Sequence, residues 1–209
     1  MNTSELRPAL AVAVLALTAC SGPITTDALS NKEPEKVESP APAVPVTAKT
    51  AFWEMYKSAH AWAPDMLPLT LEAKTIPGIK NEGGKAAMWE ATFGSPSKKE
   101  YSRFTYAVTA HPPDIRKGVA ASEALPWAGL TRDALAFQSA EFVVDSDEAY
   151  KTALAKAGPW MKEHPDVPLN TLSMGAASRF PGPVWYFLWG DKKLGFFQLI
   201  SASTGKALR

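Results

Sequence analysis

TAFWEMYKSAHAWA, residues 50–63, carries apolar side chains at intervals of three and four positions. They are Phe52, Met55, Tyr56, Ala59 and Trp62. These intervals place side chains on one face of an α-helix, so the stretch predicts an amphipathic helix that ends before Pro64. The folded part of the chain is therefore expected to begin close to residue 50.

The same pattern returns 98 residues later. Tyr150, Leu154 and Trp160 stand at the places of Phe52, Tyr56 and Trp62. Asp145 and Glu148 have the spacing of a capping box that starts a second helix. Each helix is followed by a turn rich in proline and leucine, residues 64–69 and 165–169, and then by a moderately apolar segment. The helix at residues 50–63 is therefore predicted to have a counterpart.

Two strands are predicted after each apolar segment. They are residues 87–93 and 101–108 in the first half and 184–189 and 194–200 in the second. Trp89 and Trp185 occupy matching places in them. We expect an α+β fold of two tandem repeats, residues 49–118 and 119–209, each with one helix and two or three antiparallel strands, sharing one core. Chance recurrence of frequent aromatic residues is the alternative, but the offset between the halves changes at turns, where insertions are tolerated.

Residues 1–48 are not expected to join this core, because every Phe, Trp and Tyr lies at or beyond Phe52. Residues 1–19 have a weakly basic start, an apolar run and small residues before Cys20, which predicts a secretion signal. The apolar run is shorter than the roughly 20 residues that a transmembrane helix needs. Residues 20–48 are rich in proline and predict a disordered, extended tether.

The four residues Leu17-Thr18-Ala19-Cys20 resemble the lipobox of bacterial lipoproteins. The resemblance implies cleavage of the signal and attachment of lipid, palmitate included, at Cys20. This residue is the sole cysteine of the chain, so no intramolecular disulfide explains it. Ser21 follows it in place of Asp, and the resemblance then implies the outer membrane, facing the periplasm, rather than the inner membrane of the cell envelope. The membrane is thus an expected partner, through lipid.

Composition and motifs exclude several classes of function. A net charge of +1 with no basic stripe argues against nucleic-acid binding. His60, His111 and His164 stand apart, without a second ligand at metal-binding spacing, so neither a metal nor a cofactor is expected. Gly83-Gly84-Lys85 lacks the spacing of a phosphate loop and predicts a hairpin turn.

Seven tryptophans supply the candidate binding residues. Those that match between the halves, and are predicted to be core anchors, are Trp62, Trp89, Trp160 and Trp185. Trp53, Trp127 and Trp189 have no match. They are the candidates for a binding surface, because Trp is effective where a protein contacts a carbohydrate or peptide.

The second half resembles the PepSY domain. The resemblance rests on residues 140–150 (AEFVVDSDEAY), 184–189 (VWYFLW) and 199–208 (LISASTGKAL), which supply an acidic helix start, a Trp-bearing strand and a last strand with a Thr-Gly turn. Ser201 stands where the family usually has an acidic residue. PepSY-like domains are secreted or membrane-associated modules thought to bind or restrain partners, so the resemblance implies binding rather than catalysis.

Two functions of different classes follow. The favoured one is a lipid-anchored envelope module that binds, restrains or scaffolds a protein or peptide partner. The alternative is an envelope hydrolase with dispersed acidic residues, Glu72, Glu90 or Asp166, in a cleft between the repeats. Two facing carboxylates with raised pKa values would favour the hydrolase, and a continuous aromatic patch would favour binding.

Overall fold

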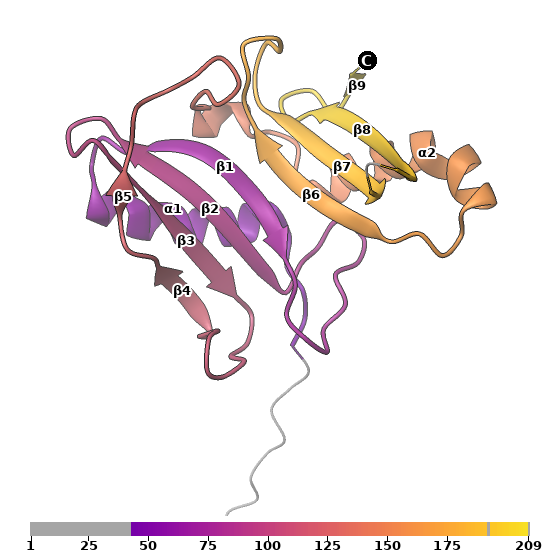
Figure 1. The fold of residues 1–209 in the computed structure, drawn as a ribbon, viewed down its shortest axis with the longest axis horizontal. Helices are drawn as coiled ribbons and strands as arrows, with labels where there is room; N and C mark the ends of the chain where they lie inside the picture. Colours follow the sequence, from indigo (N-terminus) through magenta and orange to yellow (C-terminus); the bar gives the residue numbers. More distant parts are fainter. Residues whose placement is uncertain (1–42, 192, 209) are drawn as a thin grey trace, which may run out of the picture. The chain divides into compact units, whose positions relative to one another are not determined.

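The computed structural model describes residues 43–191 and 193–208. They belong to one compact unit, in which two α-helices, one short 3-10 helix and a nine-stranded antiparallel sheet are formed by the described residues (Figure 1). The predicted α+β class is confirmed. The predicted signal, the lipid site at Cys20 and most of the predicted tether lie outside the described residues.

The first half of the folded unit contributes one helix and five strands. They are α1 (Ala48–Trp62), β1 (Leu67–Lys74), β2 (Met88–Ser95), β3 (Glu100–Ala107), β4 (Gly118–Ala121) and β5 (Leu125–Pro126). The two predicted strands are found as β2 and β3, and the apolar segment before them is a strand as well, β1. The predicted boundary between the halves, after residue 118, falls inside β4; β4 and β5 both pair with β3 and so belong with the first half.

The second half contributes the 3-10 helix, one α-helix and four strands. They are η1 (Ser139–Glu141), α2 (Ser146–Glu163), β6 (Leu169–Gly175), β7 (Val184–Gly190), β8 (Gly195–Ser201) and β9 (Ala207–Leu208). The predicted second helix and its two strands are found as α2, β7 and β8.

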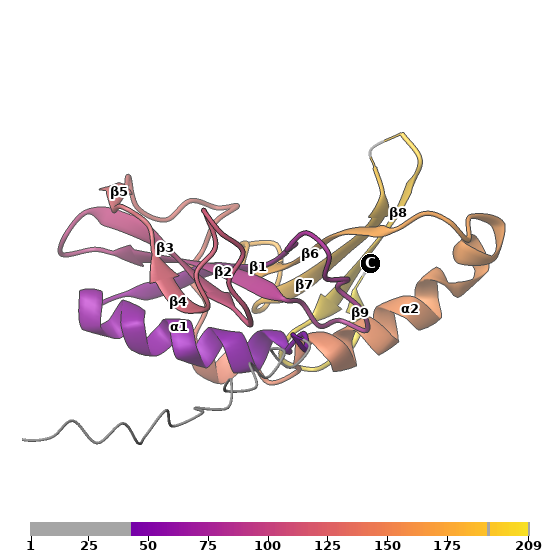
Figure 2. The ribbon, with the colours of Figure 1, turned by 90° about the horizontal axis from the view of Figure 1, so that it is seen from below.

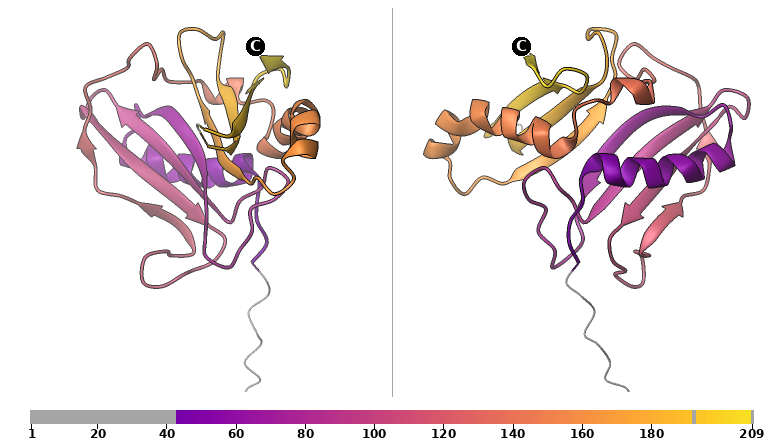
Figure 3. Two further views of the ribbon diagram at one scale, coloured as in Figure 1. Left: turned by 45° about the vertical axis from the view of Figure 1, so that its right-hand side comes forward. Right: turned by 180° about the vertical axis from the view of Figure 1, so that it is seen from behind.

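One continuous sheet joins the two halves. Its strand order is β4-β3-β2-β1-β6-β7-β8-β9, with β5 paired to β3. The halves meet at β1 and β6, which run antiparallel with Leu71 opposite Met174. Both α-helices lie on one face of the sheet, α1 on the first half and α2 on the second (Figure 2; Figure 3, right). The opposite face carries no helix from the described residues.

The core lies between the helices and the sheet. Alternate residues of β2 and β7 point toward the helices, because side chains along a strand alternate between its two faces. Trp89, Phe93, Trp185 and Phe187 are all fully buried there. Each buried indole donates its N–H to a backbone carbonyl just before a helix: Trp89 to Val46 and Trp185 to Val144, both at 3.0 Å.

The prediction of four tryptophan core anchors is right for two of them. Trp89 and Trp185 have no exposed surface. Trp62 and Trp160, near the C-terminal ends of α1 and α2, are only half-buried and pack at the margin of the core. Trp62 lies beneath the Lys98 ammonium, and Trp160 stacks on His164. Each ring also contacts the sheet, Trp62 through Phe104 of β3 and Trp160 through Phe196 of β8, but neither is fully covered.

The N-termini of α1 and α2 meet. The Ser146 hydroxyl accepts the backbone N–H of Ala48 at 2.9 Å, and the Asp145 carboxylate accepts that of Lys49 at the same distance. Asp145 is the N-cap of α2, as predicted, and also accepts the Ser146 N–H. The capping box predicted with Glu148 is not formed within the described residues, since the Asp145 carboxylate bonds the first turn of α1 instead.

The fold begins earlier than the sequence predicted. Val46 pairs with Ala86 through two backbone hydrogen bonds of 3.0 Å, and α1 starts at Ala48. The last residues of the predicted tether, 46–48, therefore belong to the folded unit, because backbone pairing and the Trp89 indole hold Val46 there.

Candidate functional site

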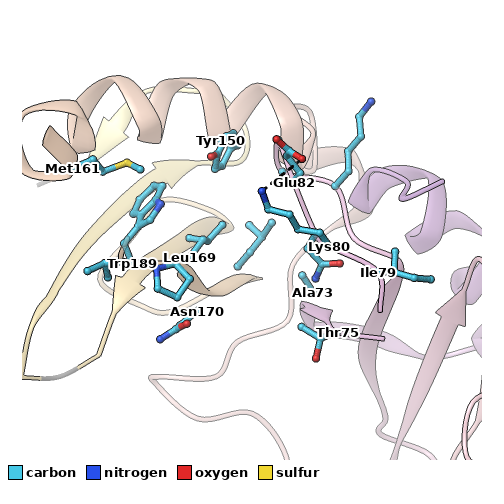
Figure 4. A pocket seen from close by; sticks show the side chains of 17 residues that line it. Ala73, Thr75, Ile79, Lys80, Glu82, Tyr150, Met161, Leu169, Asn170 and Trp189 are labelled. Atoms are coloured by element: carbon cyan, nitrogen blue, oxygen red, sulfur yellow. Dashed lines mark ion pairs between the residues drawn. The ribbon is translucent and has the colours of Figure 1, made fainter. Parts of the chain in front are cut away.

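A pocket of 440 Å³ opens beside α2 on the helix side of the sheet (Figure 4). One wall comes from α2, β6 and β7. The other wall is the connection between β1 and β2, residues 75–87, from the first half of the chain. The site is therefore assembled from segments that are far apart in the sequence.

The floor of the pocket is apolar. Its principal side chains are Tyr150, Met161, Leu169, Leu172 and Trp189. Figure 4 shows Tyr150 and Met161 projecting from α2 over the pocket, with Trp189 and Leu169 reaching it from the sheet. Sequence reasoning did not assign the first four to a site, because the apolar spacing along a helix or a strand is the same whether the side chains meet a core or a cavity.

Tyr150 supplies a polar group at this apolar floor. Its ring packs against Trp189 and Phe187. Burial, and secondarily the negative charge of Glu82, raise the pKa of its hydroxyl above the ordinary value of 10.0. The hydroxyl has no hydrogen-bond partner within the described residues, so it is a neutral group able to donate a hydrogen bond to a ligand.

The rim of the pocket is charged and built on a tight turn. Glu82 and Lys85 exchange backbone hydrogen bonds of 3.1 and 2.9 Å around Gly83 and Gly84, which both have positive φ. Two residues with positive φ are the signature of a type I′ hairpin turn. The predicted hairpin turn at Gly83-Gly84-Lys85 is thus confirmed, and it carries Lys80, Glu82 and Lys85 around the opening.

Internal contacts hold this loop in place. The Asn81 side chain donates to the Lys74 carbonyl at 3.0 Å and accepts the Ala87 N–H at 3.1 Å. Ile76 is 2% exposed in a small apolar cluster at the base of the loop. Gly84 lies directly on the start of α2, where an added Cβ would come within 2.4 Å of the Ser146 carbonyl oxygen. The pocket wall is therefore preorganised.

The three tryptophans predicted to form a binding surface do not form one. Trp189 is 1% exposed and lies in the core, because its place in β7 puts it on the same face as Trp185 and Phe187. Assignment of Trp189 to an exposed surface was wrong, although its ring does line the pocket from within. The alternation of Trp185, Phe187 and Trp189 in VWYFLW is the sequence signal that predicts burial of Trp189.

The other two tryptophans lie on opposite faces of the sheet. Trp53 is 43% exposed on α1, where it contacts Phe52 and Tyr56. Trp127 packs over Gly94, whose alternate place in β2 puts it on the face without helices. The hollow beside Trp127 is lined by a short loop and is separate from the pocket at α2.

The acidic residues of the hydrolase hypothesis are brought together only in part. Glu72 and Glu90 face each other across β1 and β2, and the Lys74 ammonium lies 2.6 and 3.4 Å from their carboxylates. Burial lowers the pKa of Lys74, but the hydrogen bond and charges of the two glutamates outweigh it, and the net shift is upward. Asp166 lies in the exposed turn between α2 and β6, outside this cluster.

An aromatic patch that the sequence did not identify lies on the helix-free face of β7 and β8. The rings of Tyr186 and Phe197 stack there with centroids 6.3 Å apart, and Phe197 is 62% exposed. Leu199, Phe180 and Arg179 border the same shallow hollow. The hollow beside this patch is more open to solvent than the pocket at α2.

The described residues contain no cluster of three or more His, Cys, Asp or Glu side chains suited to a metal ion. The His164 ring lies against Trp160 and makes a hydrogen bond of 2.9 Å with the Trp160 carbonyl. His60 and His111 are exposed. Within the same residues, neither helix combines the length and apolar character required to cross a membrane.

Comparison with known proteins gives few matches. No protein-family model matches the chain, and no curated protein does. One solved structure that aligns with it is that of a "putative lipoprotein" from Clostridium difficile 630. The two chains are 8% identical, the alignment covers 76% of this chain and 90% of the other, and the TM-score is 0.47.

Proposed function

We propose that this protein is a lipid-anchored binding module of the bacterial envelope, and that the pocket between α2 and residues 75–87 is its binding site. The ligand belongs to a protein or peptide partner. The anchor is the lipidated Cys20, held in the outer membrane and facing the periplasm, and residues 20–45 are the tether.

The pocket is the observation that carries this proposal. A ligand site is typically a preformed concave surface of about 300–1,000 Å³, mostly apolar, with a few polar groups that fix orientation. The volume of 440 Å³, the apolar floor that includes Met161 and Leu169, and the hydroxyl of Tyr150 meet this description. The lysines and the glutamate of the rim add charged groups where a ligand would enter.

The proposal includes a tandem duplication. Each half has a helix followed by three antiparallel strands, and the indole hydrogen bonds of Trp89 and Trp185 end on Val46 and Val144, which are themselves 98 residues apart. Such agreement between tertiary contacts is harder to obtain by chance than the recurrence of aromatic residues. The resemblance of residues 140–208 to PepSY domains agrees with a partner-binding role for the second copy.

The arrangement of the acidic residues favours a binding protein over a hydrolase. Glycoside and peptide hydrolysis by paired acids needs carboxylates that are free to meet the substrate. The Lys74 ammonium lies between Glu72 and Glu90 and forms an ion pair with both. We therefore propose that the ion pairs of Lys74 with Glu72 and Glu90 stabilise the pairing of β1 with β2, and that these residues take no part in catalysis.

Site-specific cross-linking tests the proposed function. A photoreactive amino acid replaces Lys85 at the rim or Lys117, an exposed lysine outside the pocket lining, in the full chain incubated with envelope extract. We expect a discrete adduct from position 85 and none from position 117. The adduct should disappear when Ala73, which lines the pocket, is changed to Phe so that a ring fills the cavity.

Two outcomes contradict the proposal. Equal adducts at positions 85 and 117 would indicate non-specific contact, and an adduct at position 85 that survives Ala73→Phe would place the partner outside the pocket. Thr70→Phe is the matched control, because Thr70 is exposed on the same strand and does not line the pocket.

A further inference from the structure

We infer that the pocket receives a phenylalanine side chain from an extended segment of the protein partner. In the first half of the chain, the equivalent place is filled by the chain's own Phe137. The inference rests on the proposed function of the pocket and names the group that enters it.

The aromatic pair at the pocket floor has a counterpart in the first half. The rings of Tyr150 and Trp189 lie 6.2 Å apart with an interplanar angle of 37°. At the corresponding positions of α1 and β2, Phe52 and Phe93 lie 6.0 Å apart at 28°. The two pairs come from the same places in the helix and in the second strand of each half.

In the first half this pair is covered by the segment that leads into α2. Phe137 is 1% exposed, and its ring centroid lies 6.0 Å from that of Phe52. Its backbone N–H donates to the carbonyl of Pro68 at 3.1 Å. Phe142 also packs on Phe52, at 5.5 Å. A stretch of main chain thus delivers two phenyl rings to the apolar surface.

In the second half the equivalent surface is open at Tyr150, which is only half-buried, whereas Trp189 is 1% exposed. Leu169, which pairs with Trp189 as Pro68 pairs with Phe93, lines the pocket together with Tyr150. The residue 98 positions before Phe142 is Val44, whose side chain is 71% exposed. The surface that holds phenyl rings in one half therefore borders a cavity of 440 Å³ in the other.

The walls favour an aromatic ring over an aliphatic group of equal size. Edge-to-face and offset contacts between aromatic rings add stabilisation beyond that of the buried area, and thioether sulfur makes favourable contacts with ring edges. Tyr150 and Met161 provide these partners, because both are half-buried and line the pocket. A segment of polypeptide suits the site because the occupant of the first half is itself polypeptide with a main-chain hydrogen bond.

The test uses three peptides of the form acetyl-Gly-X-Gly-amide and the full chain. X is 4-fluorophenylalanine, observed directly by ¹⁹F NMR, or cyclohexylalanine or alanine, used as competitors. We expect one site per chain, roughly two- to tenfold weaker binding of the cyclohexyl peptide, and no competition by the alanine peptide. Ala73→Phe should abolish binding, and Thr70→Phe should leave it unchanged.

A second variant tests the correspondence between the halves. Phe137→Ala removes the ring that covers Phe52, so the first half should acquire a site of the same kind and the number of peptide sites should rise from one to two. If this variant does not fold, as judged by circular dichroism, Phe137→Leu is used, and a weaker second site is expected.

The possible results separate the inference from the proposed function. Equal binding of phenyl and cyclohexyl peptides overturns the aromatic assignment. Binding of free 3-phenylpropionamide as tight as that of the peptide overturns the polypeptide source. Absence of peptide binding, together with a rim adduct that Ala73→Phe removes, overturns the inference while the proposed function stands; absence of both results rejects both.

Discussion

The indole rings of Trp89 and Trp185 meet edge to face in the middle of the core, with centroids 6.4 Å apart and an interplanar angle of 67°. One ring comes from each half of the chain, and both are fully buried. This contact, beside the pairing of β1 with β6, makes the two halves one packed structure.

Replacement of either ring should be strongly destabilising. Trp89→Ala or Trp185→Ala removes a large buried side chain and a hydrogen bond, and each should lower the free energy of unfolding by about 3–5 kcal/mol. The double mutant should show a coupling of about 0.5–1.5 kcal/mol, because the rings contact each other. Chemical denaturation measures both, with the exposed Trp53→Ala as control at about 1 kcal/mol or less. Two separate unfolding transitions in the wild type would contradict a shared core.

Asp145 is predicted to stabilise both helices at once. Asp145→Ala leaves the N–H groups of Lys49 and Ser146 without their acceptor, so we expect a loss of about 1–3 kcal/mol, more than a single N-cap usually contributes. Asp145→Asn keeps an acceptor oxygen and should lose less. Asp147→Ala is the matched control, because the Asp147 carboxylate accepts only the neighbouring Glu148 N–H among the described residues. Equal losses for Asp145→Ala and Asp147→Ala would show that the shared cap contributes nothing.

Asp65 should make stability depend on pH in the acidic range. Hydrogen bonds from the Ser95 hydroxyl and the Ser97 backbone N–H lower the pKa of Asp65 below its usual 3.8. A carboxyl whose pKa is lower in the folded state contributes stability above its unfolded pKa and loses it as the pH falls through the folded value. The wild type should therefore be more stable than Asp65→Asn near pH 6, and the two should converge on acidification. Urea denaturation across this range measures the difference, and a constant difference would refute the assignment.

The turn at the pocket rim can be tested with two neighbouring glycines. Gly83 and Gly84 both have positive φ, so an alanine costs roughly 1–2 kcal/mol of backbone strain at either position. Only at Gly84 would the new Cβ also press on the Ser146 carbonyl; nothing lies within 4 Å at Gly83. Gly84→Ala should thus destabilise more than Gly83→Ala and weaken binding of the fluorophenylalanine peptide. Equal effects of both variants on binding would mean that docking of the loop on α2 does not shape the pocket.

Lipidation at Cys20 is expected to set the location of the protein. Cys20→Ala should leave the chain uncleaved or release it from the membrane fraction, because the thiol that carries the lipid is lost. Mass spectrometry of the wild type from membranes should show an acylated Cys20 at the mature N-terminus. An unmodified thiol in that fraction would contradict the lipobox interpretation.

Local patterns in the sequence were enough for the elements of the fold. Helical spacing from Phe52 to Trp62 and strand-like alternation around Trp89 and Trp185 give α1, β2 and β7 within a few residues of their observed bounds. These signals depend on residues that are close together in the chain, because the period of the apolar pattern decides which side chains share one face of a helix or strand. The same reasoning correctly identified the Gly83-Gly84 turn, because glycine readily adopts positive φ.

Contacts between residues that are far apart in the sequence decided burial and capping, which local patterns did not predict correctly. Trp189 was misassigned because a missing match at equal spacing says nothing about which face of β7 a residue occupies. Trp62 and Trp160 share the periodicity of buried residues and contact Phe104 and Phe196 of the sheet, yet they are only half-buried. Helical spacing does not determine how completely neighbouring elements cover a ring. Asp145 reads as the cap of its own helix, but the proximity of α1 gives its carboxylate a second set of donors.

The amino-acid sequence by itself determined the class of the fold, its helices and the strands of its core, since periodicity and turn chemistry act over a few residues. Only the tertiary structure brought the loop of residues 75–87 against α2, filled one aromatic surface with Phe137 and left a pocket at the other. Those contacts join residues more than 50 positions apart, and their geometry follows from how the whole sheet and both helices pack, which no local pattern encodes.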